Sequence, residues 1–144
     1  DRYRKLLAQM SPADMPTAVR DALTALHNAG LKLAVGSSSK NAAYILERLD
    51  ANRYFDAVCD GTMIAHSKPD PEIFLLAAEK LGTAPAHTLV LEDSYNGVRA
   101  GAAGGFVTVM VPDLLPADDE MRGLYTMECT SLNEVLAKLK TGEL

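Results

Sequence analysis

The chain has 144 residues, of which 48% are hydrophobic, and its 14 basic and 19 acidic residues give a formal net charge of −5. This length and apolar content suit a single globular domain with a substantial core. An acidic balance without any basic run argues against nucleic acid and anionic membrane surfaces as partners.

Two isolated cysteines, Cys59 and Cys129, form neither a C-x-x-C pair nor a disulfide framework. Cys59 is expected to be a small buried residue, because nothing near it in the sequence would activate a thiol. No signal peptide opens the chain, and no apolar run approaches the roughly 20 residues that span a bilayer. These features predict a soluble, reduced, cytoplasmic protein.

The first third of the chain alternates between helical and extended patterns. Residues 1–10 (DRYRKLLAQM) are polar and helix-prone, like the end of a helix that begins elsewhere. After a break at residues 11–14, apolar residues at helical spacing predict a helix that ends at Gly30. Residues 31–36 (LKLAVG) predict a strand, and a second helix is expected after the serine run that follows it.

The middle third continues the alternation. Residues 55–59 (FDAVC) predict a short strand, and residues 60–62 a turn. Asp70 can cap the next helix, Pro71 suits its first position, and Glu72 favours the positive end of its dipole. The apolar face and the terminal glycine of this helix are expected to be Phe74, Ala77, Ala78, Leu81 and Gly82.

The last third adds two buried strands and two helices. Residues 89–91 (LVL) have the bulk of a strand buried on both faces, and a helix is expected to begin near Asn96. Residues 106–111 (FVTVMV) predict another strand. The remaining expectations are a loop at 113–121, an edge strand at 126–130 and a capping box at 131–134 that opens a final helix. Alternating strands and helices predict a doubly wound α/β domain with a parallel sheet.

Two acids, Glu92 and Asp93, follow the 89–91 strand directly. In open α/β sheets ligands bind beyond the carboxyl ends of the strands, so an acid pair there is well sited for a metal ion. Taken alone, two acids at a strand end are more often solvated turn residues.

Two further loops are expected at the same edge of the sheet. The first is the serine run at residues 37–39, which by itself is usually a helix cap. The second carries Lys68, which by itself is usually a solvated lysine. A hydroxyl with free amides binds phosphate, a lysine neutralises its charge, and a carboxylate pair holds Mg²⁺. In combination the three loops predict a phosphoryl-transfer site.

The segments GSSSKN, SKPDPEIF and LVLEDSYNGVRAG resemble the second, third and fourth motifs of the haloacid dehalogenase-like (HAD) hydrolases. The similarity covers about residues 12–140 and points to the branch that contains β-phosphoglucomutase and the phosphoglycolate phosphatases. It implies a Rossmann-like core. It also implies a Mg²⁺-dependent enzyme for a small phosphorylated metabolite.

The resemblance implies a role for each loop. Ser37 and the amide of Ser38 would bind the phosphoryl group, and Lys68 would bridge that group and the nucleophile. Glu92 and Asp93 would hold Mg²⁺. Three further residues would grip the non-reacting end of the substrate: Ser39, Lys40 and Asn41.

One departure from the family pattern concerns the nucleophile. The family uses the first aspartate of an Asp-x-Asp motif on a central strand, and this sequence contains no Asp-x-Asp. We therefore interpret residues 1–11 as a remnant of the helical cap or linker and residues 12–144 as an incomplete core. The missing strand would lie between the strands that end at Gly36 and Leu91.

Loss of a central strand would leave two unpaired backbone edges. The expected outcomes are self-association, completion by an N-terminal segment, or closure of the remaining strands with displaced loops. The chain alone is expected to be inactive, because phosphate and metal contacts without a nucleophile provide binding only.

For the complete protein the sequence predicts a phosphomonoester hydrolase that acts through an aspartyl phosphate on a sugar phosphate or phosphoglycolate. A mutase of the β-phosphoglucomutase type is the alternative, and residues of the cap would decide between the two reactions.

Two further alternatives belong to other classes of protein. A response-regulator receiver would place its acid pair first and its hydroxyl later, the reverse of the order here. A non-catalytic phosphate- and metal-binding remnant stays open.

Overall fold

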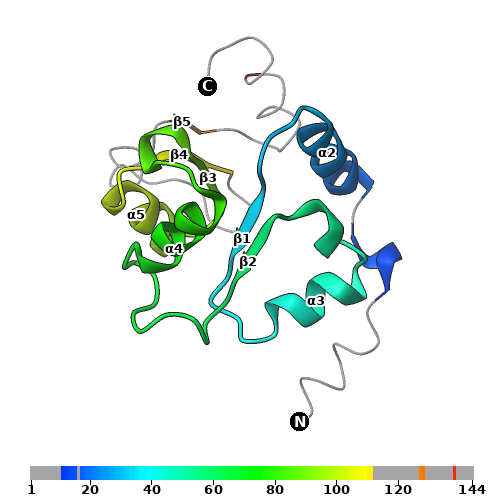
Figure 1. The fold of residues 1–144 in the computed structure, drawn as a ribbon, viewed down its shortest axis with the longest axis horizontal. Helices are drawn as coiled ribbons and strands as arrows, with labels where there is room; N and C mark the ends of the chain where they lie inside the picture. The colour runs from blue at the N-terminus through cyan, green and yellow to red at the C-terminus, as the bar shows by residue number, and fades with distance from the viewer. Residues whose placement is uncertain (1–10, 16, 112–126, 129–137, 139–144) are drawn as a thin grey trace.

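The computed structural model describes residues 11–15, 17–111, 127–128 and 138 (Figure 1). The elements follow one another as η1 (Pro12–Asp14), α2 (Thr17–Asn28), β1 (Ala34–Gly36), α3 (Ala42–Arg48), η2 (Asn52–Tyr54), β2 (Ala57–Cys59), α4 (Glu72–Leu81), η3 (Pro85–His87), β3 (Leu89–Glu92), α5 (Tyr95–Ala103), β4 (Val107–Met110) and β5 (Met127–Glu128). Within these ranges no helix has the length and apolar content needed to cross a membrane.

All the strand pairs in this part of the chain are parallel, and they form two sheets. β1 pairs with β2, with Val35 opposite Val58. β4 pairs with β3 on one side and β5 on the other, in the order β3-β4-β5. No ladder joins β1 to β3 among the residues described. The predicted doubly wound α/β class is confirmed, and the expected gap between the strands that end at Gly36 and Leu91 is present as a division between two sheets.

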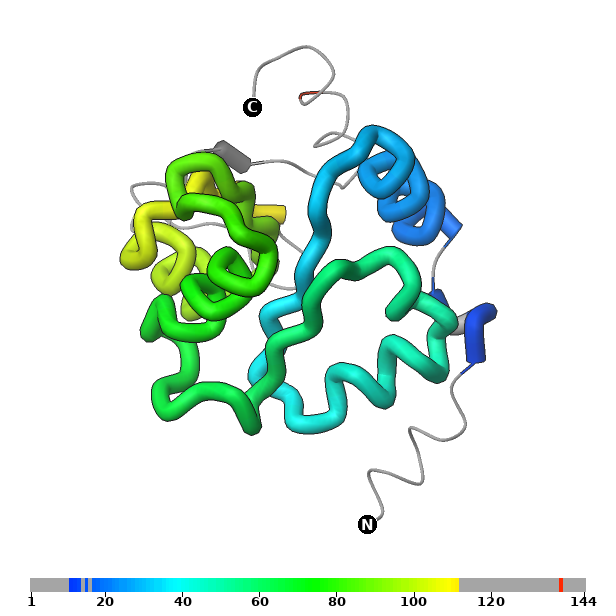
Figure 2. Tube along the Cα trace, in the orientation of Figure 1, coloured from blue at the N-terminus to red at the C-terminus, as the bar shows by residue number. Residues whose placement is uncertain are grey.

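α4 lies between the first sheet and α5 (Figure 2). It contacts both strands of the first sheet, and its buried face forms one cluster with residues of β3 and α5. The rings of Phe74 and Phe106 meet edge to face with centroids 6.1 Å apart. The buried members of the cluster are Cys59, Ile73, Phe74, Ala77, Ala78, Val90, Ala100 and Phe106. The expectation that Cys59 is buried is therefore confirmed.

The glycines that were expected to end helices do so. Gly30 after α2 and Gly82 after α4 have φ angles of +81° and +71°, a left-handed conformation that glycine adopts without steric cost. In each case the following residue donates a backbone hydrogen bond into the last turn, from Leu31 to Leu26 and from Thr83 to Ala78. Sequence and structure agree on these boundaries because the determinant is local.

The first predicted strand is shorter than expected. β1 begins at Ala34 rather than at residue 31. The amide of Leu33 donates to the carboxylate of Asp56 at 2.9 Å, so a side chain takes the place of a ladder carbonyl there. The predicted edge strand at 126–130 appears as β5, whereas residues 1–10, the 113–121 loop and most of the final helix lie outside the described residues.

Candidate functional site

The ammonium group of Lys68 lies between the ends of β1 and β3. Its Nζ donates to the carbonyl oxygen of Gly36 at 3.1 Å and to Oε1 of Glu92 at 2.7 Å. The ring of Phe74 lies 4.8 Å from the same nitrogen. The side chains of Lys68 and Glu92 are largely buried, with 13% and 12% of their surfaces exposed, respectively. A cation held by a carbonyl, a carboxylate and an aromatic face has a fixed position.

The carboxylate of Glu92 is also held from its other side. Its Oε2 accepts hydrogen bonds from the hydroxyl of Ser94 at 2.9 Å and from the Ser94 amide at 3.3 Å. The same hydroxyl accepts from the amide of Gly97 at 3.0 Å and so caps α5. A Cβ atom on Gly97 would overlap the carboxyl group of Glu92. The start of α5 is therefore shaped around this carboxylate.

Asp93 follows Glu92 and is exposed. Mg²⁺ is commonly bound through one or two carboxylates, with water and substrate phosphates completing its shell. In the part of the chain that the structure covers, no group of three or more histidine, cysteine or acidic side chains could hold a metal ion by itself. Glu92 and Asp93 offer the type of oxygen ligand that Mg²⁺ prefers, and Asp93 is the more exposed of the two.

The serine run forms a compact loop between β1 and α3. The amide of Ser37 donates to the carbonyl of Cys59 at 3.0 Å, which continues the β1-β2 ladder by one bond. Ser37 Oγ accepts from the amide of Ser39, and Ser39 Oγ accepts from the amide of Asn41, each at 3.1 Å. As acceptors the two hydroxyls keep their own protons available for donation. Ser38 and Lys40 are exposed in the same loop.

A turn at the end of β2 supports this loop, and sequence reasoning assigned it no role. Asp60 Oδ1 accepts the hydroxyl of Thr62 at 2.5 Å and its amide at 2.8 Å, and these bonds hold the pKa of Asp60 below its ordinary value. Gly61 lies so close to the carbonyl of Ser38 that any Cβ there would collide with it. The signal was an Asp-Gly-Thr sequence at a strand end, the pattern of a side-chain-stabilised turn.

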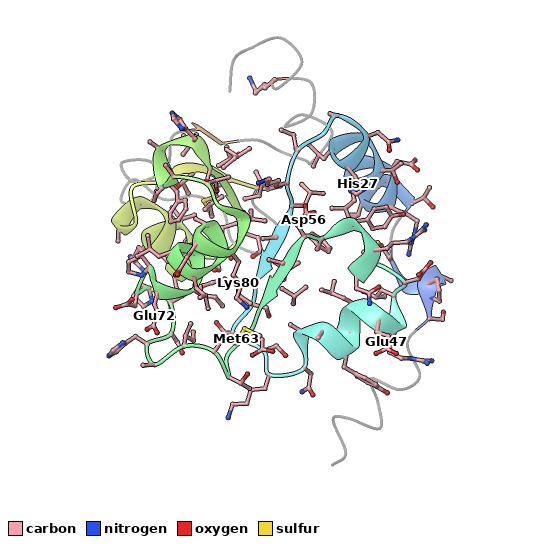
Figure 3. All side chains as sticks on the ribbon, in the orientation of Figure 1. His27, Glu47, Asp56, Met63, Glu72 and Lys80 are labelled. Carbon is pink, nitrogen blue, oxygen red and sulfur yellow. The ribbon has the colours of Figure 1, made fainter. Side chains whose placement is uncertain are left out.

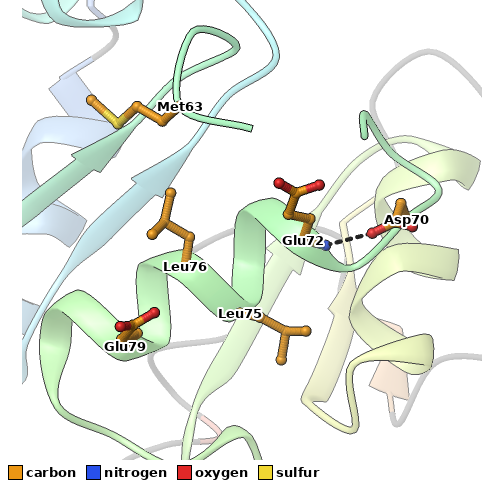
Figure 4. A pocket seen from close by; sticks show the side chains of 6 residues that line it. All are labelled: Met63, Asp70, Glu72, Leu75, Leu76 and Glu79. Atoms are coloured by element: carbon orange, nitrogen blue, oxygen red, sulfur yellow. Dashed lines mark hydrogen bonds between the residues drawn. The ribbon is translucent and has the colours of Figure 1, made fainter. Parts of the chain in front are cut away.

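Glu72 fixes the loop that carries Lys68. Its carboxylate accepts from the amides of Ala65 and His66, both at 2.8 Å, and lies 3.1 Å from Nδ1 of His66. The two amide bonds hold the pKa of Glu72 below its ordinary value. The Glu72 amide in turn donates to Asp70 at 3.0 Å (Figure 4). The sequence predicted only a favourable helix-dipole position for Glu72 and missed the clamp, by which we mean the hydrogen bonds from the Ala65 and His66 amides to its carboxylate.

The model of the haloacid dehalogenase-like hydrolase family matches residues 2–105, well over half of the chain. The chain belongs to this family of HAD-like hydrolases. The resemblance carried by the serine, Lys68 and Glu92-Asp93 segments is thereby confirmed, because all three lie inside the matched range.

Relatives of this HAD-like chain include phosphosugar mutases and phosphatases. It is 38% identical over 109 residues to β-phosphoglucomutase of Bacillus subtilis, across 76% of this chain and 48% of the relative. It is 37% identical to phosphoglycolate phosphatase of Salmonella typhimurium, across 76% of this chain and 44% of that protein. The chain thus spans about half the length of these curated relatives.

The fold of the HAD-like chain agrees with that of a solved relative. The crystal structure of β-phosphoglucomutase from Clostridium difficile superimposes with a TM-score of 0.83 at 25% sequence identity, covering 98% of this chain and 62% of that one. The match confirms the predicted α/β fold of the HAD-like chain. The relatives differ in whether they hydrolyse or transfer the phosphoryl group, so the family alone does not choose between these reactions.

Proposed function

We propose that the complete protein containing this chain is a Mg²⁺-dependent phosphomonoester hydrolase for a small phosphorylated metabolite, of the sugar phosphate or phosphoglycolate type. The observation that carries the proposal is the position of the Lys68 ammonium, fixed between Gly36 and Glu92 at the carboxyl ends of two strands. The serine loop begins at the residue after Gly36, and Asp93 follows Glu92. The groups that we propose to bind phosphate and metal therefore flank one cation.

Lys68 is suited to contact a phosphoryl oxygen. An ammonium group has three hydrogens, and the carbonyl of Gly36 and the carboxylate of Glu92 take two of them. The third remains for the substrate. Because the cation is already oriented, it stabilises developing charge without reorganisation, an effect typically worth about 10²- to 10³-fold in rate for one donor.

The other residues take the roles that the family pattern implies. Ser37 Oγ and the amide of Ser38 would donate to the phosphoryl oxygens, and the residues that would grip the far end of the substrate are Ser39, Lys40 and Asn41. Glu92 and Asp93 would hold Mg²⁺, which when bound screens the charge of the phosphoryl group. The proposal assigns the nucleophilic aspartate to residues outside these 144, because no Asp-x-Asp occurs among them.

A mutase is the second candidate, and the 38% identity to a β-phosphoglucomutase favours it. A mutase would return the phosphoryl group to a sugar hydroxyl, whereas a phosphatase passes it to water. We expect the choice between mutase and phosphatase to depend on the cap residues that would cover the site, and not on the three loops described above. A non-catalytic module that binds phosphate and metal is the candidate from another class, and it predicts binding without turnover.

The test uses the complete protein and the 144-residue chain, each with its intact mass determined. Sugar phosphates and phosphoglycolate are supplied with Mg²⁺ or with EDTA, and ³¹P NMR separates released phosphate from isomerised sugar phosphate. We expect Mg²⁺-dependent phosphate release by the complete protein, lost in Asp93→Asn and retained in the control Asp21→Asn, an exposed aspartate on α2.

The other outcomes are equally informative. Isomerised sugar phosphate instead of free phosphate would replace the phosphatase with the mutase. Turnover by the chain of 15.4 kDa would refute the assignment of the nucleophile to residues outside it. Phosphate binding without turnover by the complete protein would leave only the binding module.

A further inference from the structure

A polar cavity lies outside the loops of the proposed active site, and none of the residues that line it belongs to those loops. It has a volume of about 220 Å³ and lies between α2 and η2, near His27 (Figure 3). We call it the Arg53 pocket, and its lining residues are Thr24, His27, Asn28, Arg53 and Tyr54. η2 precedes β2 whereas the Asp60 turn follows it, so the pocket and the proposed active site lie at opposite ends of that strand.

The lining of the Arg53 pocket is rich in hydrogen-bond donors. All five residues carry a polar side chain, and none of them is acidic, although the chain as a whole has a net charge of −5. A hydroxyl, an imidazole, a carboxamide, a guanidinium and a phenol can all donate to oxygen. Such a wall is complementary to an anion.

Two guanidinium groups surround the phenol of Tyr54. The Arg53 guanidinium lies 4.8 Å from the ring centroid and that of Arg20 lies 6.0 Å from it. Arg53 Nη2 also donates to the phenolic oxygen at 3.1 Å. Hydrogen bonds from Thr24 and Arg20, together with the charge of Arg53, hold the pKa of Tyr54 below its ordinary value. The surroundings of the phenol thus favour negative charge.

The two arginines differ in how many donors they have left. Arg20 donates to the backbone carbonyls of Pro12, Leu49 and Asp50, so it ties α2 to the end of α3. Arg53 uses Nε and Nη2, and its Nη1 has no partner among the residues that the structure describes. Within the same part of the chain, the side chains of His27 and Asn28 also make no hydrogen bond. These three groups are open to a ligand.

The acidic groups nearby do not cancel this charge. The carboxylate of Asp50 lies 3.6 Å from Arg53 Nη2 and is 57% exposed, so water weakens its attraction. Asp56 directs its carboxylate to the amide of Leu33. In the described part of the chain, Arg53 pairs with the Asp50 carboxylate whereas Arg20 donates to backbone carbonyls, so the two guanidinium groups leave a local excess of positive charge.

We propose that the Arg53 pocket binds a small oxyanion, either phosphate or a small carboxylate. The volume corresponds to about seven water molecules in the liquid, enough for either group. The shared chemistry is a compact anion whose oxygens accept from Arg53, His27 and Asn28. The site is separate from the loops that would carry the hydrolase reaction.

The test is a ¹H–¹⁵N NMR titration of the full chain with inorganic phosphate, repeated with acetate, at an ionic strength held constant with sodium chloride. The His27 ring and Asn28 amide signals are expected to shift and saturate. Asn28→Asp is nearly isosteric and adds a negative charge to the lining, so it should weaken binding about tenfold. The matched control Asn52→Asp adds the same charge to the exposed first residue of η2, outside the lining, and should leave binding unchanged.

The same titrations identify which anion binds and include the results that would overturn the proposal. Saturation by phosphate but not acetate, or the reverse, identifies the anion. Shifts that grow linearly, that chloride reproduces, or that respond equally to both variants would overturn the proposal. Saturation at the Ser38 and Ser39 amides without any at His27 would overturn it too, while leaving the proposed hydrolase site intact.

Discussion

The Nζ atom of Lys68 lies 2.7 Å from Oε1 of Glu92 and joins two sheets that no ladder connects in the described part of the chain. Lys68→Met should therefore reduce stability, because Glu92, only 12% exposed, would lose its cationic partner and keep only the donors of Ser94 among the described residues. We expect a loss of about 2–3 kcal/mol in the free energy of unfolding, measured by urea denaturation.

The control for this change is Lys80→Met, since Lys80 is exposed and, among the described residues, its ammonium group donates only to the sulfur of Met63, at 3.8 Å. A change within about 0.5 kcal/mol is expected there. In the complete protein Lys68→Met should also lower turnover by about 10²- to 10³-fold. Equal effects of the two substitutions on stability would show that the bridge between the sheets contributes nothing.

Glu72→Gln should loosen the loop that carries Lys68. The amides of Ala65 and His66 donate to different carboxylate oxygens, Oε1 and Oε2, and a carboxamide replaces one of these acceptors with an NH₂ donor. We expect faster hydrogen exchange at these two amides and faster acetylation of Lys68, read by mass spectrometry. Glu79→Gln, an exposed change on the same helix, is the control. Unchanged labelling of Lys68 in Glu72→Gln would mean that the clamp does not position it.

The contribution of Glu72 should depend on pH in a defined direction. Its pKa is lowered below the ordinary value of 4.5 in the folded protein, because backbone amides stabilise the ionised form. A lowered carboxyl pKa stabilises the fold above the unfolded value and loses that effect as pH falls through the folded value. The stability difference between the wild type and Glu72→Gln should thus be constant near pH 7 and shrink below about pH 4.5. A difference that grows on acidification would reverse this assignment.

The ends of the helices and the positions of the strands along the chain were largely predictable, because each depends on a few adjacent residues. Glycine at a left-handed position ends α2 and α4, and short apolar runs mark β3 and β4. The acid pair, the lysine and the serines were found because their spacing resembles a family pattern. Local chemistry and motif spacing can both be read from one sequence.

The side-chain contacts between loops were not predictable in the same way. Glu72 reaches back six and seven residues to the His66 and Ala65 amides, and Gly61 touches a carbonyl more than twenty residues earlier. Which carboxylate oxygen of Glu92 meets Lys68 and which meets Ser94 depends on packing between β3 and α5. Such pairings are set by tertiary geometry, which periodicity does not encode.

Ser94→Ala should destabilise the start of α5 and release one side of Glu92. The serine hydroxyl accepts from the Gly97 amide at 3.0 Å and donates to Oε2 of Glu92 at 2.9 Å, so two bonds are lost at once. Removal of an N-cap costs about 1 kcal/mol, and the loss of a donor to a carboxylate adds to this. Ser94→Thr keeps both functions and serves as the control. A loss below about 0.5 kcal/mol in the alanine variant, measured by urea denaturation, would show that water replaces both bonds.

Gly97→Ala should be strongly destabilising, although alanine is normally the better helix former. The added methyl group would overlap the carboxyl group of Glu92, which would have to leave its position between Lys68 and Ser94. Overpacking of this kind costs about 1–3 kcal/mol. A double-mutant cycle with Glu92→Ala tests this cause of the destabilisation, because the second substitution removes the carboxyl group that the added methyl group would overlap. If the collision is the cause, Gly97→Ala will cost little or will stabilise in the Glu92→Ala background, whereas an undiminished penalty there would place the strain in the backbone of α5 instead.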